Sequence, residues 1–351
     1  MCGIIGVTSS NNVQDYIIAS LKRLEYRGYD SSGIATVSDK KLKFCKAEGK
    51  INNLTKKLKD NPLKGFNGIG HTRWATHGNV SEDNAHPHIS GKVAIVHNGI
   101  IENFQEIKDK LSSKGRKFNS QTDSEVIAHL FDYEFSKNTS KKEATQNVLK
   151  ILKGAYAFVV LDLDDPNTLI AARNASPLAI GKGDKTNSVG SDAIALAGIA
   201  KQIIFLEDGD FAILNDKHIN IYDLNGNSIK REVKPNSLDP AVISKGNYRH
   251  FMQKEIYEQP ETISHTISEM YNSDGKISEN LSEIIGHNPK SITILAAGTS
   301  YYAGLIGKYW IESLAEIPVN VEIASEFRYR KPFIDPDGMI ITISQSGESI
   351  D

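Results

Sequence analysis

The chain begins with Met1-Cys2-Gly3-Ile4-Ile5-Gly6-Val7-Thr8, a β-rich run with a cysteine at its head. Removal of Met1 would leave a free α-amine and a thiol on the same residue, Cys2. Model α-amines titrate at about 7.7–8.0 and thiols at about 8.5, so near neutral pH an unprotonated amine can accept the thiol proton. An amine activates an N-terminal threonine in the same way, and cysteine is the better nucleophile. The stretch predicts a nucleophilic Cys2 on a buried strand, with a small buried apolar residue as the plainer alternative.

Strand-like and helix-like patterns alternate through the first part of the chain. Apolar residues at three-to-four spacing, at 13, 17, 21 and 24, predict a first helix, and turn residues follow at 27–30. Strands are predicted at 2–8, 32–37, 68–72, 92–97, 156–163, 203–206 and 211–214, and helices at 101–111 and 124–135. The pattern favours an α+β architecture of two sheets with helices on their outer sides.

A change of pattern predicts a second domain. The stretch 232–246 is rich in Pro, Asn, Ser and Asp, and we interpret it as a linker with a boundary near residue 240, which separates domain 2–240 from domain 241–351. A helix is expected from about residue 248, strands at 291–296 and 339–344, and a helix at 301–314. Strand, helix and strand in this order predict a parallel α/β sheet. Two or three strands cannot cover both sheet faces, so we expect a piece of a longer protein.

Composition excludes several classes of protein. The 41 Lys and Arg residues nearly balance the 43 Asp and Glu residues, so net charge gives no reason to expect nucleic acid or an anionic membrane as a partner. No apolar run approaches the roughly 18 residues that a membrane helix needs. Two cysteines in 351 residues argue against a disulfide framework and for the cytoplasm. We interpret Cys45, in an alternating stretch, as a strand residue without a chemical role.

Polar side chains gather at 71–78, His-Thr-Arg-Trp-Ala-Thr-His-Gly, directly after a predicted strand. The planar fork of Arg73 suits a carboxylate, although a surface Arg beside a core Trp would explain the same residues. Five histidines fall between 71 and 97, and His86 and His88 would share one strand face, so zinc is a second alternative. The chain lacks the HExxH and CxxC patterns, and we therefore expect no metal.

Two further segments combine a plain and a chemical interpretation. Asn98-Gly99 ends a predicted strand, where the Asn amide and the Gly N–H could face one oxyanion, although Asn-Gly is commonly a simple turn. Thr122-Asp123-Ser124-Glu125 is typical of a helix N-cap, and the alternative is that Asp123 binds a substrate ammonium.

Two hydroxyl-rich loops, at 297–300 and 344–349, each follow a predicted strand of the second domain. Such loops present backbone N–H groups that suit a phosphate without a basic residue. Ordinary helix caps are the alternative, but two loops at neighbouring strand ends favour a phosphate site.

The motifs at 1–6, 27–31, 71–78, 97–99 and 122–123 together resemble the glutaminase domain of class II glutamine amidotransferases. The stretches 248–260 and 322–330 and the two loops resemble the branch of that family that aminates fructose 6-phosphate. The resemblance implies an N-terminal-nucleophile hydrolase fold, an αββα sandwich, followed by the beginning of an α/β sugar isomerase (SIS) domain. It also implies no cofactor, and a homodimer when the protein is full length.

The resemblance assigns a role to each motif. The catalytic residues would be Cys2, which forms a glutamyl thioester, and Asn98 and Gly99, which hold the oxyanion. The glutamine-binding residues would be Arg27, Arg73, Trp74, Thr76, His77 and Asp123. The residues that bind the sugar phosphate would be Thr299, Ser300, Ser344, Gln345, Ser346 and Ser349. The sequence departs from the family pattern at Ala297, where a Cys is common, and at Ser349, where Thr is common and the hydroxyl is kept.

The implied substrates are L-glutamine and fructose 6-phosphate, and the implied products are glutamate and glucosamine 6-phosphate. The isomerase acid, base and lysine are expected beyond residue 351, so this chain would retain at most the glutaminase half-reaction. Another class II amidotransferase, such as an asparagine synthetase or a phosphoribosyl amidotransferase, would need a nucleotide or diphosphate site where the two loops stand. A phosphosugar-responsive regulatory protein with an inactive amidase domain is the alternative from another class, although the intact site residues speak against decay.

Overall fold

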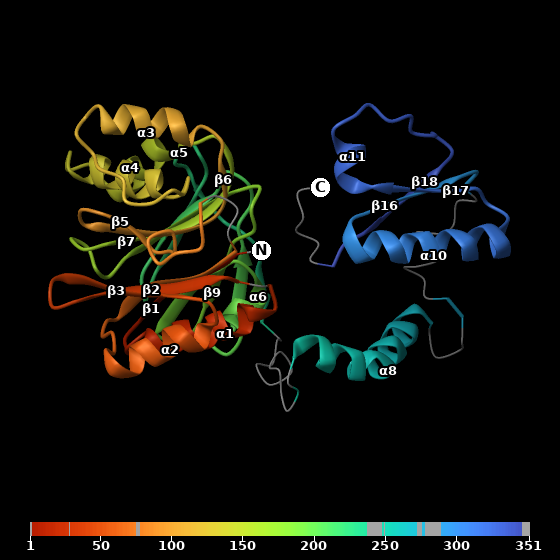
Figure 1. The fold of residues 1–351 in the computed structure, drawn as a ribbon, viewed down its shortest axis with the longest axis horizontal. Helices are drawn as coiled ribbons and strands as arrows, with labels where there is room; N and C mark the ends of the chain where they lie inside the picture. Colours follow the sequence, from red (N-terminus) through yellow and green to blue (C-terminus); the bar gives the residue numbers. More distant parts are fainter. Residues whose placement is uncertain are drawn as a thin grey trace. The chain divides into compact units, whose positions relative to one another are not determined.

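The computed structural model divides the chain into two compact units, Met1–Asn247 and Tyr248–Asp351 (Figure 1). The residues that it describes are 2–27, 29–74, 78–236, 248, 250–271, 276–277 and 289–345.

The first unit contains two antiparallel sheets. In the described residues the larger sheet has the order β15(Val233–Pro235), β11(Gln202–Phe205), β9(Ala179–Lys182), β10(Thr186–Gly190), β1(Gly3–Ser9), β4(Asn67–Arg73), β2(Ser31–Ser38), β3(Lys41–Glu48). The smaller sheet has the order β14(Ser228–Ile229), β13(Ile219–Tyr222), β12(Phe211–Leu214), β8(Leu169–Asn174), β7(Gly154–Asp162), β6(Val93–Ile101), β5(His88–Ser90). The predicted two-sheet architecture is confirmed.

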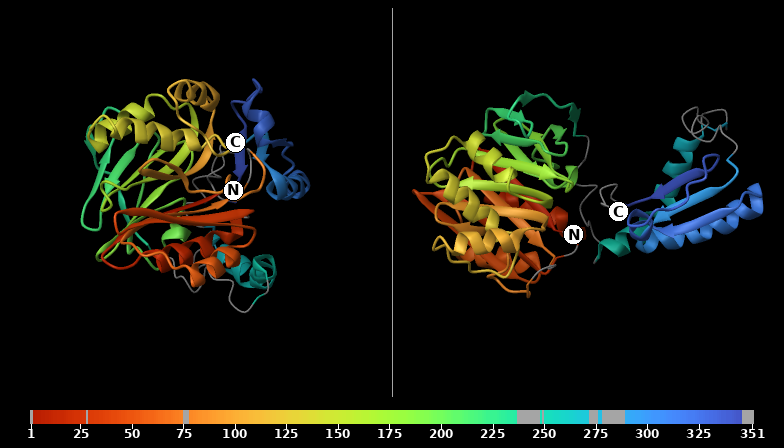
Figure 2. Two further views of the ribbon diagram at one scale, coloured as in Figure 1. Left: turned by 60° about the vertical axis from the view of Figure 1, so that its left-hand side comes forward. Right: turned by 90° about the horizontal axis from the view of Figure 1, so that it is seen from above.

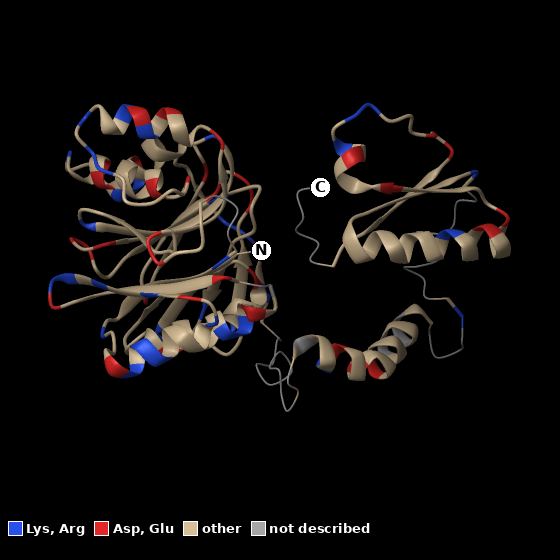
Figure 3. Cartoon of the chain, in the orientation of Figure 1, with Lys and Arg blue, Asp and Glu red and all other residues tan. Residues whose placement is uncertain are grey.

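Helices cover the outer face of each sheet (Figures 1 and 2). The larger sheet packs against α1(Gln14–Arg23), α2(Ile51–Asp60) and α6(Ala193–Leu196), and the short 3-10 helix η1(Leu24–Arg27) continues α1. The smaller sheet packs against α3(Phe104–Ser112), α4(Glu125–Phe135) and α5(Lys141–Leu149). Of these outer helices, α1, α2, α3 and α5 each carry residues of both charge signs, whereas α4 carries only acidic residues (Figure 3). The order helix, sheet, sheet, helix is the αββα sandwich that the resemblance implies.

Side-chain alternation along the strands separates the layers. Successive residues of a strand point to opposite faces of the sheet. Ile4 therefore packs between the two sheets, whereas Ile5 packs against the helices. The sheets approach closely, because a Cβ atom on Gly6 would lie 3.0 Å from Cγ1 of Val159 on the opposite sheet. Burial on both faces explains why β1 is apolar almost throughout.

Two element boundaries differ from the predictions. We expected the strand at 92–97 to end at Asn98-Gly99, but β6 continues to Ile101 and pairs with β7 over its whole length. The turn interpretation of Asn98-Gly99 is therefore wrong, and α3 starts at Phe104 instead of 101. The predicted linker also begins with an edge strand, since Val233–Pro235 pairs with β11. In both places, pairing with a strand distant in the sequence extends or creates the strand, and local amino-acid composition does not predict such pairing.

The second unit contains a parallel sheet, as predicted. Its described strands have the order β17(Val319–Ile323), β16(Ile292–Ala296), β18(Met339–Ile343), and its described helices are α8(Phe251–Met270), α10(Gly298–Ala315) and α11(Ala324–Arg328). Ile294 packs under Gly304 of α10, where a Cβ would lie 3.0 Å from its Cγ2. In the described part of the chain, no helix combines the length and the apolar character needed to cross a membrane.

The close contact of the two sheets generates a stability prediction. We expect Val159→Ala to lower the free energy of unfolding by about 1.5–3 kcal/mol, because Val159 is fully buried between the sheets. Val233→Ala is the matched control, since Val233 is 48% exposed, and it should change stability by less than about 0.5 kcal/mol. Urea unfolding followed by circular dichroism measures both, and equal losses would contradict the described packing.

Candidate active site

The space between the two sheets turns from apolar to polar at one end. On β4, Ile69, His71 and Arg73 share the face toward the smaller sheet, because they are two residues apart. On β6, Val96 and Asn98 share the face toward the larger sheet for the same reason. The apolar residues of these two rows pack in the core between the sheets. The polar residues, which follow them along each strand, meet at the end of that core.

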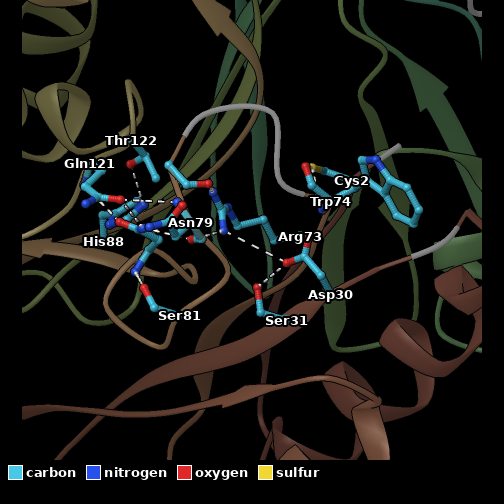
Figure 4. A network of polar contacts seen from close by, with 12 residues as sticks. Cys2, Asp30, Ser31, Arg73, Trp74, Asn79, Ser81, His88, Gln121 and Thr122 are labelled. Atoms are coloured by element: carbon cyan, nitrogen blue, oxygen red, sulfur yellow. Dashed lines mark hydrogen bonds and ion pairs between the residues drawn. The ribbon is translucent and has the colours of Figure 1, made fainter.

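Cys2 lies at this polar end. It precedes β1, whose Gly3 pairs with Thr72 near the end of β4. The Trp74 backbone N–H donates to the Cys2 Sγ at 3.2 Å, and Figure 4 shows the two residues side by side. Burial raises the pKa of the Cys2 thiol above its ordinary value, and the Trp74 N–H and the Arg73 charge offset part of this rise. The site therefore offers the sulfur a hydrogen-bond donor that favours the thiolate.

Asn98 approaches Cys2 from the opposite sheet. Its Nδ2 donates to the Cys2 carbonyl oxygen at 3.2 Å, and its Oδ1 lies 2.9 Å from the Nε2 of His71. The next residue, Gly99, has φ +114°, and a Cβ there would lie 2.1 Å from the Ala155 carbonyl oxygen. Only glycine fits this position. The structure thus brings Asn98 into contact with Cys2, and Gly99 follows Asn98 on the same strand.

The Gly99 N–H points away from β7. Glu102 N–H donates to the Lys153 carbonyl, whereas Ile101 N–H donates to the Asp123 side chain. N–H groups alternate between the two sides of an antiparallel strand, so Gly99 shares the direction of Ile101. The Asn98 amide and the Gly99 N–H are therefore two donors next to Cys2 that could receive an oxyanion.

Arg73 ends β4 and is 3% exposed. Its guanidinium donates to the carbonyl oxygens of Gly78 and Asn79 at 3.4 and 3.3 Å, and it lies 3.9 Å from the carboxylate of Asp30 (Figure 4). These contacts fix the direction of a group whose planar fork matches a carboxylate. The surface interpretation of Arg73 is wrong.

Asp123 is buried, and its Oδ2 accepts from the Ile101 N–H at 2.7 Å. The carboxylate is therefore fixed to β6 two residues after Gly99. The predicted helix cap takes a different form, because α4 begins at Glu125 and its N-cap residue, Ser124, makes no capping bond with its side chain. Asp123 contacts the strand instead of the helix, which places a negative charge at the polar end of the sandwich.

A cluster of buried histidines supports these residues. Burial lowers the pKa of His71 to about 3 and the pKa values of His86, His88 and His97 below the usual range, so all four rings are neutral at physiological pH. His88 Nε2 pairs with the hydroxyl of Thr122 at 2.9 Å. Among the described residues, no three His, Cys, Asp or Glu side chains lie close enough together to bind a metal ion.

Sequence reasoning missed Glu125 as a support of the site. Burial raises the pKa of this carboxyl, but hydrogen bonds from His129, Asn119 and Ser120 outweigh burial and lower it to about 2. The Ser120 hydroxyl in turn lies 3.0 Å from the hydroxyl of Thr122, and Thr122 directly precedes Asp123. The only signal in the sequence was the Glu at the start of a predicted helix.

Several predicted site residues are described in part or not at all. Trp74 is 52% exposed and contacts Cys2 through its backbone. Of Arg27, only the backbone is described, at the end of η1. The other predicted positions lie outside the described residues: Met1, Thr76, His77, Ser346 and Ser349.

In the second unit, the described parts of the two predicted phosphate-binding stretches lie at the same edge of the sheet. β16 and β18 are parallel neighbours, and Ala296 pairs with Ile343 at their carboxyl ends. Ser344 and Gln345 follow β18 directly. The stretch at 297–300 is the first turn of α10 and not a loop, so Thr299 and Ser300 are helical. The N-cap residue, Ala297, makes no capping bond with its side chain, and the first N–H groups of α10 begin at the same edge.

Known proteins share both units. Residues 71–198 match the family model described as a glutamine amidotransferase domain, and residues 287–351 match the SIS domain model. The chain thus contains a region similar to glutamine amidotransferase domains and a region similar to SIS domains. It is similar over its whole length to two proteins named glutamine–fructose-6-phosphate aminotransferase (isomerizing). That of Rhizobium meliloti (strain 1021) is 48% identical over 353 residues, and that of Zymomonas mobilis subsp. mobilis is 46% identical over 352 residues. The chain spans 58% of the length of each relative.

Solved structures agree with this family at the level of the fold. The glutamine phosphoribosylpyrophosphate amidotransferase of B. subtilis, in complex with ADP and GMP, has a TM-score of 0.58 at 23% identity. The match covers 91% of this chain and 65% of that chain. A structure titled as the allosteric regulatory enzyme of purine biosynthesis has the same TM-score at 24% identity, covering 95% and 68%. The αββα sandwich is the N-terminal-nucleophile hydrolase fold.

The conformation at Gly99 generates a testable prediction. We expect Gly99→Ala to destabilise the chain by at least about 2 kcal/mol more than Gly115→Ala. Both glycines have positive φ, but an added Cβ meets a carbonyl oxygen at 2.1 Å only at Gly99, and at Gly115 it meets nothing within 4 Å. Gly115→Ala therefore isolates the cost of backbone strain, about 1–2 kcal/mol. Chemical unfolding of both variants measures the difference, and equal costs would show that the contact relaxes.

Proposed function

We propose that Cys2 is the nucleophile of a glutaminase reaction that supplies ammonia to a sugar phosphate. One observation carries the proposal: two hydrogen-bond donors meet at Cys2. The Trp74 N–H donates to its sulfur, and the Asn98 amide donates to its carbonyl oxygen from the opposite sheet. Similarity over the whole chain to glutamine–fructose-6-phosphate aminotransferases supports the same reaction.

In the proposed reaction, the Cys2 α-amine, freed by removal of Met1, takes the thiol proton, and the sulfur attacks the side-chain carbonyl carbon of glutamine. The oxyanion of the tetrahedral intermediate receives hydrogen bonds from Asn98 Nδ2 and Gly99 N–H. The C–N bond breaks, ammonia leaves with a proton from the amine, and a glutamyl thioester remains. Water then hydrolyses the thioester to glutamate and restores the thiol.

Charge complementarity orients the substrate. Arg73 would bind the α-carboxylate of glutamine by two parallel hydrogen bonds, and Asp123 would bind the α-ammonium. Arg27, Trp74, Thr76 and His77 complete the proposed pocket by resemblance, with Trp74 on the path of ammonia. The buried histidines near these residues are uncharged, so they add no further cation that could compete with Arg73 for the carboxylate of glutamine or pair with Asp123.

We infer that the sugar phosphate binds in the second unit, at the shared edge of β16 and β18. Thr299, Ser300, Ser344 and Gln345 are described there, and Ser346 and Ser349 follow in the sequence. A phosphate would receive backbone N–H groups at the start of α10. The whole protein would convert fructose 6-phosphate and glutamine into glucosamine 6-phosphate and glutamate, and this chain alone would carry the glutaminase half. The homodimer and the cytoplasmic location stay predictions. Neither Cys2 nor Cys45 forms a disulfide in the structure.

The nucleophile is tested by exchanging each cysteine. We expect Cys2→Ala to lower glutamate release from glutamine by at least about 1,000-fold, because no other group replaces the thioester route. Cys45→Ala should keep the wild-type rate, because Cys45 lies on β3, which β2 separates from β4. Mass spectrometry of the N-terminal peptide shows whether Met1 is removed and whether an electrophilic glutamine analogue attaches to Cys2. Equal glutamate release by wild type and Cys2→Ala would end the proposal.

The acceptor is tested with the whole protein. We expect fructose 6-phosphate to increase the rate of glutamate release and glucosamine 6-phosphate to accumulate, because the two units act in sequence on one nitrogen. Glucose 6-phosphate serves as the control sugar, as it lacks a ketone. Glutamate release without any amino sugar in the product would favour a different amidotransferase, or a regulatory role of the second unit.

A further inference from the structure

We propose that His71 is a positioning residue that fixes the Asn98 side-chain amide so that its N–H groups, and not its oxygen, face the reacting carbonyl. The inference rests on the proposed function, since it concerns the oxyanion donors of that reaction. It goes beyond that proposal because His71 itself contacts neither the sulfur nor, in the assigned roles, the substrate.

The orientation of the amide follows from the hydrogen bonds around it. The Cys2 carbonyl oxygen can only accept, so the Asn98 atom that lies 3.2 Å from it must be Nδ2. The other end of the amide, Oδ1, therefore faces the Nε2 of His71 at 2.9 Å. Because Oδ1 can only accept, Nε2 must carry the proton. One backbone carbonyl thus determines the tautomer of a histidine on a different strand.

The surroundings of His71 hold the ring in place and keep it neutral. The ring is fully buried on β4, and it packs against the His86 ring at a centroid distance of 4.0 Å. Burial lowers the pKa of His71 to about 3, so the ring stays neutral and has a single N–H across the physiological range. With its single proton on Nε2, the neutral ring matches only an amide whose oxygen faces it, whereas an imidazolium would add a charge next to Arg73.

The consequence for the reaction concerns the second N–H of the amide. One Nδ2 hydrogen binds the Cys2 carbonyl, and the other is available to an oxyanion beside Gly99 N–H. If the amide turned over, Oδ1 would face the Cys2 carbonyl and the oxyanion, and both contacts would become repulsive. His71 adds to the effect of the Cys2 carbonyl in opposing this rotation, because the turned amide would direct its own N–H at the Nε2 hydrogen.

The first experiment is a double-mutant cycle in the glutaminase assay. His71→Leu removes the donor at similar volume, and His71→Gln keeps an N–H near the position of Nε2. Loss of one oxyanion donor lowers kcat by about 100–1,000-fold, and we expect that loss for Asn98→Ala. For His71→Leu we expect kcat to fall by about 10–100-fold, with KM within about threefold of the wild-type value. His71→Gln should recover most of kcat. The variant with both His71→Leu and Asn98→Ala should lose no more than Asn98→Ala alone.

Two results would overturn the proposal. One is a loss of kcat in the double variant equal to the product of the two single losses, and the other is an equal loss of kcat in His71→Gln and His71→Leu. Unfolding midpoints of all variants separate a loss of kcat from a loss of folded protein. The second experiment does not depend on activity. Long-range ¹H–¹⁵N NMR of histidine-labelled chain, with His71 assigned by its absence in His71→Gln, should show the Nε2–H tautomer from pH 6 to 8 at about constant shift. The Nδ1–H tautomer would overturn the inference, whereas absent glutamate release in wild type would overturn only the proposed function.

Discussion

The hydrogen bond between the Asn98 side chain and the Cys2 carbonyl is the contact on which the site depends. It joins the two sheets at the end where the facing rows of side chains change from apolar to polar. The apolar rows, with Ile69 and Val96 among them, hold the sheets at a fixed separation through close packing. The polar residues next in each row, His71 and Asn98, therefore meet at hydrogen-bond distance without a loop to bring them there.

Burial has opposite consequences for the two kinds of polar group at this end. The histidines lose their charge, because an isolated imidazolium in a dry interior is too costly. Asp123 and Arg73 are buried as well, and backbone groups satisfy them: the Ile101 N–H in one case and the carbonyls of Gly78 and Asn79 in the other. The polar end thus holds a fixed guanidinium, which lies 3.9 Å from Asp30, and the fixed carboxyl group of Asp123, and the proposed glutamine site uses both.

The second unit uses a different physical device. Parallel strands end at one sheet edge, so the residues after β16 and β18 lie together although the sequence separates them. The sequence predicted this edge well because buried parallel strands give strong apolar runs. It misplaced the start of α10 by about one turn, since Gly298, Thr299 and Ser300 are poor helix formers that the helix nevertheless includes.

The sequence by itself determined which reactive side chains stand in distinctive motifs, namely a cysteine behind the initiator methionine, an arginine and an aspartate. It also determined the apolar periodicity of the strands, which predicts two sheets. It could not decide that Asn98-Gly99 continues a strand, that Val233–Pro235 pairs with β11, or that His71 and Glu125 support the site. These features arise from partners far along the chain, and periodicity reports only the face on which a residue lies. Only the tertiary structure shows which residue stands opposite.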